Sequence, residues 1–338
     1  MMQQTSINQT SQRNITQFIW IRVIACLFIV LLHTLFSSTV YFKDTITDGQ
    51  LMATQTAQHL LMWAVPCFLM VTGALLLDPD RKVGMKKLFG RYIRRIALAL
   101  VCFTLLFQIL DYCMGDETSI IPGWLSNLFQ GHSWAHMWYL YLMLGIYLMI
   151  PFYKMIANQA KLGLIWFLIL IIVIFVSILP LGGYLGLEDC GFYIPTSLIY
   201  PVYVFGGYAL YQQNQPVWLA ALVLAVSTIL IIALSLAGAG EDFFGYDSIL
   251  VVAQSLALFS LLLRLKLPAG EVIRSLDDCS FGIYLIHMIG VRFVMKWVGF
   301  DPFAHGAVLC FALMVIAFFV VSFAASYLLR LIPKLDLL

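Results

Sequence analysis

Long apolar runs separated by short polar stretches follow one another along almost the whole chain. Ten of these runs have about the length of a helix that crosses a lipid bilayer. They lie at 17–37, 57–77, 96–112, 135–152, 162–181, 193–211, 217–237, 248–263, 279–298 and in a last stretch that ends near residue 329. Such long runs favour helices over the strands of a barrel. The pattern predicts an all-α, polytopic integral membrane protein with about ten transmembrane helices.

The composition agrees with this prediction. Of the 338 residues, 62% are hydrophobic and 11% are charged, whereas a soluble domain is about 25% charged. We expect one membrane domain over 17–331 between polar cytoplasmic tails at 1–16 and 332–338. The net charge of +2 gives no reason to expect a nucleic-acid partner. None of the seven cysteines forms a CxxC motif or pairs with histidine at a metal-ligand spacing, so no metal centre is predicted.

The distribution of charge predicts the orientation in the membrane. Ten spans place both termini on the same side. With the N-terminus inside, fifteen of the nineteen Lys and Arg residues fall in inner segments, whereas eleven of the seventeen acidic residues fall outside. Basic residues collect on the cytoplasmic side of membrane proteins. The expected topology is therefore N-in and C-in.

The first apolar run carries two ionisable residues, Arg22 and His33. Eleven residues of α-helix rise about 16 Å and rotate about 20° beyond three full turns, so both side chains lie on one face. Ionisable groups within a bilayer are costly and are functional candidates by default. The alternative is structural: an arginine that extends to the interface and a histidine bonded to a neighbouring helix. In the predicted topology, Arg22 lies near the cytoplasmic surface and His33 in the outer half.

Further candidates lie in the fourth and ninth runs. His287 is about 15 Å from the inner face, at a depth similar to that of His33, and serves either catalysis or a structural hydrogen bond. Three residues, His136, Trp138 and Tyr139, stand at the outer end of the fourth run. They form either part of the interfacial aromatic belt or the wall of a sugar site.

The inner segment 78–95 is the densest basic cluster, with seven Lys and Arg residues. Arg91 and Arg94 are three residues apart and lie close together if this segment is helical. They either bind phosphate groups or anchor the protein to anionic lipid. No carboxylate is predicted in the middle of a span, which argues against a proton- or ion-coupled transporter.

Five segments, in order along the chain, resemble motifs of the membrane acyltransferase 3 family. They are Arg22-x10-His33, Arg91-x-x-Arg94, PCFLMVTGALLL (66–77), HMWYLYLMLGIYLMIPFY (136–153) and SFGIYLIH (280–287). Thr72 stands where the family's second-helix motif usually has serine. The resemblance is strongest to the short, stand-alone subgroup typified by the enterobacterial common antigen O-acetyltransferase.

The resemblance implies a multi-pass protein of the cell inner membrane, surrounded by lipid, with no bound cofactor and with acetyl-CoA as co-substrate. The acceptor is expected to be a glycan or a lipid-linked saccharide. The implied roles are catalysis for His33 and His287, donor binding for Arg22, Arg91 and Arg94, and acceptor binding for His136, Trp138 and Tyr139. His33 acts either as a general base or as an acyl carrier. Two other functions stay open, a transporter of small solutes or lipid-linked sugars and a non-catalytic scaffold.

Overall fold

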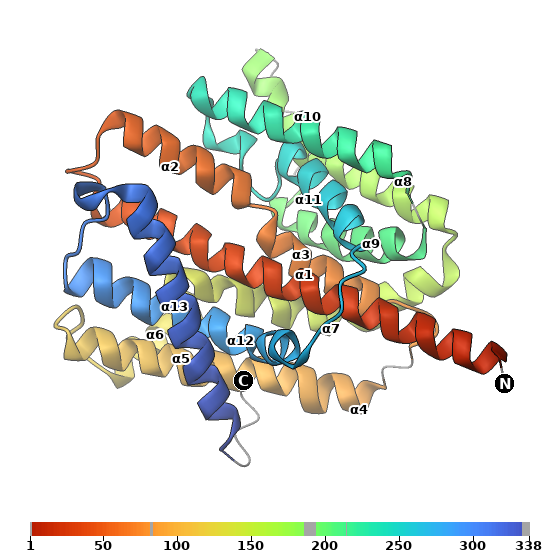
Figure 1. Ribbon diagram of the computed structural model, residues 1–338, viewed down its shortest axis with the longest axis horizontal. Helices are drawn as coiled ribbons and strands as arrows, with labels where there is room; N and C mark the ends of the chain where they lie inside the picture. The colour runs from red at the N-terminus through yellow and green to blue at the C-terminus, as the bar shows by residue number, and fades with distance from the viewer. Residues whose placement is uncertain (1, 82–83, 186–193, 214, 333–338) are drawn as a thin grey trace.

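The computed structural model describes residues 2–81, 84–185, 194–213 and 215–332, with side chains from residue 16 onwards except at 184–185, and this part of the chain contains no strand. Figure 1 shows helices that lie roughly side by side, with α13 crossing them obliquely. The helices are α1 Met2–Tyr41, α2 Asp48–Leu61, α3 Ala64–Leu76, α4 Met85–Lys87, α5 Arg94–Cys113, α6 Ile121–Gln130, α7 Trp138–Gln159, α8 Leu162–Val173, α9 Ile199–Gln212, α10 Val217–Leu236, α11 Ile249–Leu262, α12 Glu271–Arg292 and α13 Ala307–Arg330.

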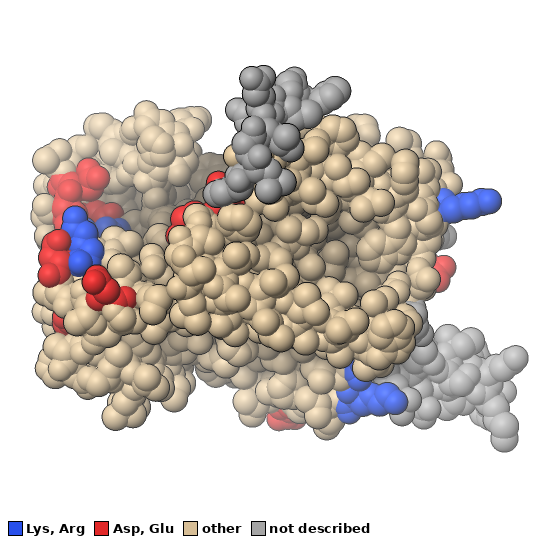
Figure 2. All heavy atoms as spheres, turned by 90° about the horizontal axis from the view of Figure 1, so that it is seen from above, with Lys and Arg blue, Asp and Glu red and all other residues tan. Residues whose placement is uncertain are grey.

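Eight helical segments within the described residues are long and apolar enough to cross a membrane. They correspond to eight of the ten predicted runs. The other two runs form α9 and α11, which have 14 residues each. They are therefore about 21 Å long, shorter than the hydrocarbon core of a bilayer. Figure 2 shows charged side chains at both ends of the molecule and a broad uncharged belt between them, interrupted by a few acidic atoms in a hollow.

Helices α1 and α12 run parallel in a constant register. Arg22 contacts Asp277, the thiol of Cys26 donates to the Ser280 carbonyl, and His33 contacts His287, so the pairing offset is 254 or 255 residues each time. Parallel helices cross a membrane in the same direction. Two helices run parallel only if an odd number of membrane crossings lies between them. Five candidate spans lie between α1 and α12, so α9 and α11 either both cross the membrane or both do not.

Glycines allow α3 and α9 to pack at backbone distance. A Cβ atom on Gly73 would lie 1.8 Å from the Val204 carbonyl oxygen, and one on Gly207 would lie 2.1 Å from the Met70 carbonyl oxygen. Small residues at such contacts are typical of membrane helices. Gly73 belongs to the segment 66–77, so this contact gives that segment a structural role. Helix α9 is mostly buried in the centre of the molecule.

Several predicted boundaries are wrong. Helix α2 begins at Asp48 instead of residue 57, because Thr47 and Gln50 form a reciprocal capping box. Helix α12 begins at Glu271 instead of residue 279. A continuous helical segment starts at Met85 and runs through α4, a π-helical turn and α5. The segment 78–95 was expected to be a loop between two spans. The predicted tail at 332–338 lies outside the described residues, apart from residue 332.

Candidate functional site

His33 and His287 form a hydrogen-bonded pair between α1 and α12. Their Nδ1 and Nε2 atoms are 2.8 Å apart, and the ring planes differ by 11°. The other nitrogen of His287, Nδ1, lies 3.1 Å from the Ile283 carbonyl oxygen, which can only accept a hydrogen bond. Therefore His287 Nδ1 carries a proton, His287 Nε2 accepts, and His33 Nδ1 donates. This chain of bonds leaves the lone pair of His33 on Nε2.

His136 completes a cluster of three histidines. Its ring lies 6.1 Å from that of His33 and 5.6 Å from that of His287, between ring centroids. Tyr284 packs edge-on against His136 at 5.5 Å, and its hydroxyl group donates to the His136 carbonyl oxygen. His136 is 1% exposed. Four rings from three separate helical segments therefore converge at one point.

A cavity of about 360 Å³ opens beside this cluster, and His33 and His136 form part of its wall. Residues at the outer end of α1 line one side of the cavity. Other polar side chains that line it are Gln108, Asp111, Glu117, Asn127, His132 and Arg292. By the predicted topology this cavity faces the outer side of the membrane. It combines hydrogen-bonding groups with aromatic rings, as sites for small polar ligands do.

Arg292 and Asp111 join α12 to α5 at the cavity wall. Arg292 Nη1 lies 3.1 Å from Asp111 Oδ1, and the Trp134 indole nitrogen donates to Asp111 Oδ2 at 2.7 Å. The Arg292 guanidinium also lies 4.4 Å from the centre of the Trp134 ring, and Phe107 stacks on that ring at 4.1 Å. Trp134 is 6% exposed and held by these contacts, so its ring face is not a free platform for a sugar.

A second ion pair lies next to this contact and joins Lys296, at the end of the span Glu271–Trp297, to Asp116, which lies outside the candidate spans. Lys296 Nζ is 2.6 Å from Asp116 Oδ2, and the Trp297 indole nitrogen donates to the same oxygen. Burial disfavours the charged form of the Asp116 carboxyl, but hydrogen bonds from Lys296 and Trp297 outweigh it and hold its pKa below the usual value. These contacts tie the outer end of α12 to the loop after α5.

Two of the three predicted acceptor-binding residues lie outside the cavity. Trp138 packs against Tyr200 at 5.8 Å and Tyr246 at 5.5 Å, and Tyr139 packs against Tyr284 at 5.5 Å. Only His136 of the predicted set contributes to the cavity wall. The helical turn that begins α7 directs Trp138 and Tyr139 towards other aromatic side chains, and their predicted role in acceptor binding stays a prediction.

At the inner end of the same two helices, Arg22 forms a bidentate ion pair with Asp277. Its Nε and Nη2 atoms each lie 2.6 Å from a carboxylate oxygen. The third nitrogen, Nη1, has no hydrogen bond to any part of the chain that the structure describes. Arg22 is 26% exposed at its side chain, whereas Asp277 is 10% exposed. The pair aligns α1 with α12 and still leaves one N–H-bearing nitrogen of Arg22 for a ligand.

The basic residues at the inner end of α5 lie near this pair. Arg91 and Arg94 are exposed. The next residue, Arg95, lies 4.9 Å above the Phe281 ring of α12. On the neighbouring helix α7, Tyr147 packs 6.0 Å from Tyr92 and interacts electrostatically with Arg22 and Arg95. Arg22 and Arg95 therefore lie close together beside Tyr147 and, with the neighbouring Arg91 and Arg94, form a basic region that faces the inner side in the predicted topology.

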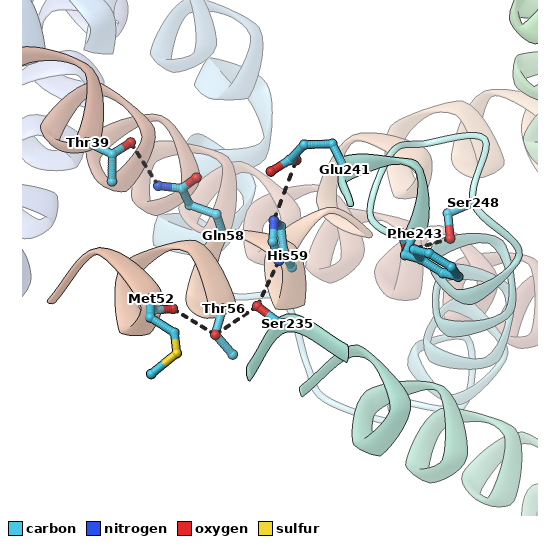
Figure 3. Close-up of polar contacts among 9 residues, drawn as sticks. All are labelled: Thr39, Met52, Thr56, Gln58, His59, Ser235, Glu241, Phe243 and Ser248. Atoms are coloured by element: carbon cyan, nitrogen blue, oxygen red, sulfur yellow. Dashed lines mark hydrogen bonds and ion pairs between the residues drawn. The ribbon is translucent and has the colours of Figure 1, made fainter. Parts of the chain in front are cut away.

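Figure 3 shows another buried histidine, His59, which lies between Ser235 and Glu241 and apart from the three histidines above. The set resembles a catalytic triad, but its hydrogen bonds exclude one. Thr56 donates to the Met52 carbonyl oxygen at 2.8 Å, so Ser235 donates its only proton to Thr56 at 2.9 Å. His59 Nδ1, 3.0 Å from Ser235, must then donate to the serine oxygen. It cannot accept the serine proton, so Ser235 is not an activated nucleophile.

Two residues of the site were not predicted from the sequence. Asp277 was assigned to a loop, although its ten-residue spacing to His287 nearly equals the eleven-residue spacing from Arg22 to His33. Matched spacings on two helices are a signal that would have paired them. Asp111 ends an apolar run, and nothing in its local sequence links it to Arg292, 181 residues away.

Comparisons with known proteins agree with the resemblance seen in the sequence. A family model described as an acyltransferase domain matches residues 15–331. No curated protein and no solved structure matches the chain. Among the described residues, no group of three or more His, Cys, Asp or Glu side chains has the arrangement of a metal site.

Proposed function

The chain belongs to the acyltransferase 3 family, and from this premise we propose that it is an O-acetyltransferase of the cell inner membrane. It moves an acetyl group from cytoplasmic acetyl-CoA to a hydroxyl group of a cell-surface or lipid-linked glycan. The observation that carries the proposal is the His33–His287 pair beside the outer cavity. It gives His33 an unprotonated nitrogen at the place where an acceptor hydroxyl would enter.

In the proposed reaction, His33 Nε2 takes the proton of the acceptor hydroxyl while the oxygen attacks the thioester carbonyl carbon. The tetrahedral intermediate then expels the CoA sulfur, which leaves with the proton held by His33. His287 orients the His33 ring and fixes its tautomer. The same lone pair would also serve an acetyl-imidazole intermediate, and rapid quenching with labelled acetyl-CoA separates the two mechanisms.

The inner basic region supports a phosphate-bearing donor. Arg91 and Arg94 are exposed, and Arg22 keeps Nη1 outside its ion pair with Asp277. Guanidinium groups bind phosphate oxygens through directed N–H donors. We propose that these residues hold the phosphates of CoA. The pantetheine arm then covers the distance of about 16 Å along α1 from Arg22 to His33.

The outer cavity supports a polar acceptor without a strong net charge. Its Arg292 is neutralised by Asp111, and its other polar groups include the carboxamides of Gln108 and Asn127. Such groups match the paired donor and acceptor character of sugar hydroxyls. We therefore propose that a glycan enters from the side opposite to acetyl-CoA.

The test uses purified protein in lipid nanodiscs with acetyl-CoA, and it measures the release of free CoA with and without extracted cell-envelope glycans. The proposal expects release that depends on glycan in the wild type and is lost in His33→Ala. Absence of CoA release with every glycan fraction would contradict it. Succinyl-CoA and longer acyl-CoA thioesters, added in parallel, test the choice of acetyl.

One observation favours a transporter as the second candidate. The span Asp48–Leu76 is interrupted between α2 and α3, and discontinuous helices are typical of transporters. His59 lies just before this interruption. Uptake of labelled acetylated or free glycan into sealed proteoliposomes without acetyl-CoA would favour transport over transfer.

A further inference from the structure

His136 is a buried polar side chain whose hydrogen-bonding capacity is unused. It is 1% exposed, and neither ring nitrogen has a hydrogen-bond partner among the described residues. The Leu285 carbonyl oxygen lies near the ring, but not in the geometry of a hydrogen bond. Buried polar groups without partners are rare in folded proteins, and each requires an explanation. His136 is one of the residues that line the outer cavity, so a ligand bound beside it is the candidate for the missing partner.

The surroundings of His136 hold its ring in place. The Phe107 and Tyr284 rings pack at 5.4 Å and 5.5 Å, and the Tyr284 hydroxyl group holds the backbone of His136. His33, whose Nε2 lone pair is available, lies 6.1 Å away between ring centroids. A molecule that reacts at His33 Nε2 therefore lies within reach of the His136 ring.

We infer that His136 supplies the N–H group that stabilises the negatively charged oxygen formed on the donor carbonyl during acyl transfer. This inference rests on the proposed function. When the acceptor oxygen bonds to the carbonyl carbon, the proton of the acceptor hydroxyl passes to His33 Nε2 and the electron pair of the C=O bond moves onto the carbonyl oxygen. The N–H group of His136 donates to that oxygen until the carbon–sulfur bond breaks. Preorganised donors of this kind are usually the largest single contribution to acyl-transfer catalysis.

Two other ring side chains near His33 are already committed. The Tyr284 hydroxyl donates to the His136 carbonyl oxygen, and both nitrogens of His287 are used in the chain from Ile283 to His33. In contrast, the neutral imidazole of His136 can carry its single N–H on either ring nitrogen. The tautomer with the proton on the nitrogen nearer the substrate can therefore donate a hydrogen bond to it. This is a different role from packing against a sugar ring.

Two substitutions of nearly equal size test the inference. His136→Gln keeps an N–H donor, whereas His136→Met removes it, and His305→Met is a matched control at an outer histidine away from the cavity. The experiment measures kcat and KM for glycan transfer and also the slow hydrolysis of acetyl-CoA by water without glycan. A group that stabilises the oxyanion assists both reactions, whereas a group that only binds the glycan assists transfer alone.

We expect His136→Met to lower kcat of transfer and the hydrolysis rate together by about 10²–10³-fold, with both KM values nearly unchanged. His136→Gln should stay within about tenfold of the wild type. Loss of transfer with normal hydrolysis, or an increase in KM alone, would overturn the inference. If His136→Met does not fold, His136→Gln decides: a folded Gln variant as inactive as His33→Ala overturns it, and an active one supports it. No turnover in the wild type would instead contradict the proposed function.

Discussion

The hydrogen-bonded groups around His33 and His59 run in the same direction, from a backbone carbonyl to a histidine Nδ1. They differ in what lies beside the Nε2 atom of that histidine. In both, a backbone carbonyl that can only accept fixes the direction of the chain of bonds, and the histidine at its end donates through Nδ1. In His33, this arrangement leaves the lone pair on Nε2. The Nε2 of His33 belongs to a residue that lines a cavity, whereas the Nε2 of His59 lies 3.7 Å from the carboxylate of Glu241.

This difference separates the proposed general base, His33, from a histidine in an ionic contact, His59. A carboxylate beside His59 offers a partner for its protonated form, and no hydroxyl group is placed to give it a proton. His33 Nε2 has no such partner within the described residues, and His33 lines a cavity. Residue types alone, a serine and an acid near a histidine, would have pointed to the wrong cluster.

The largest expected effect separates the two clusters directly. His33→Ala should reduce glycan transfer by at least about 10³-fold, because it removes the general base. His59→Ala should retain activity within about threefold. CoA release by both variants, normalised to folded protein from size-exclusion chromatography, is the measurement. A well-folded His33→Ala protein with normal activity would remove the basis of the comparison.

His287 should have the next largest effect, because it holds His33 in the reactive tautomer. His287→Met should lower kcat by about 10²-fold, since losing the partner that sets a catalytic histidine's tautomer is costly. His287→Gln, whose side-chain oxygen can accept from His33 Nδ1, should keep more activity. Steady-state kinetics of the two variants are the test, and equal activities would show that the hydrogen bond does not matter.

The inner ion pair should affect stability and donor binding more than the chemical step. Asp277→Ala should lower the stability of the protein by about 1.5–3 kcal/mol, because Arg22 loses two charge-assisted hydrogen bonds in a partly buried place. Thermal unfolding in detergent, with and without acetyl-CoA, checks this. Arg22→Ala should additionally raise KM for acetyl-CoA. Equal KM values in Arg22→Ala and the wild type would exclude a phosphate contact.

Substitution of Ser235 should have a smaller effect on stability than Asp277→Ala. Ser235→Ala removes the hydrogen bonds that join α10 to Thr56 and His59 in α2, at a cost of about 0.5–1.5 kcal/mol each at most. Glycan transfer should not change. Thermal unfolding and activity of Ser235→Ala are the paired measurements, and a loss of activity in a stable variant would restore Ser235 as a nucleophile.

The smallest effect is expected at the outer ion pair. Asp116→Asn should cost about 0.2–1 kcal/mol at neutral pH, because the pair with Lys296 is partly exposed. The pKa of Asp116 is held below its usual value. The stabilisation from the ion pair is therefore complete when the pH is above the ordinary aspartate pKa of about 3.9, and it is lost as the pH falls through the lower pKa of the folded protein. The difference in melting temperature between variant and wild type should therefore vanish in acid. A constant difference would contradict the assignment.

The sequence predicted the helical class, the shared face of Arg22 and His33 and the matching depth of His33 and His287, because these follow from helical periodicity. The structure confirms them through the contacts of both residues with α12. The subgroup of the family, the number of spans and the topology stay predictions. The partners Asp277 and Asp111 were missed, since pairing between helices far apart in the chain depends on packing that no local pattern encodes. Trp138 and Tyr139 lie outside the cavity that His136 lines, because helical rotation within one turn separates them from it, and their role in acceptor binding stays a prediction.

In the proposed mechanism, His33 joins a donor on one side of the membrane to an acceptor on the other. The most direct test uses sealed proteoliposomes with one orientation of the protein, acetyl-CoA labelled in its acetyl group on the side of Arg91 and glycan on the opposite side. The account predicts that labelled acetyl groups appear on the glycan and that none appear with His33→Ala. Label transferred only when glycan and acetyl-CoA share a compartment would contradict it.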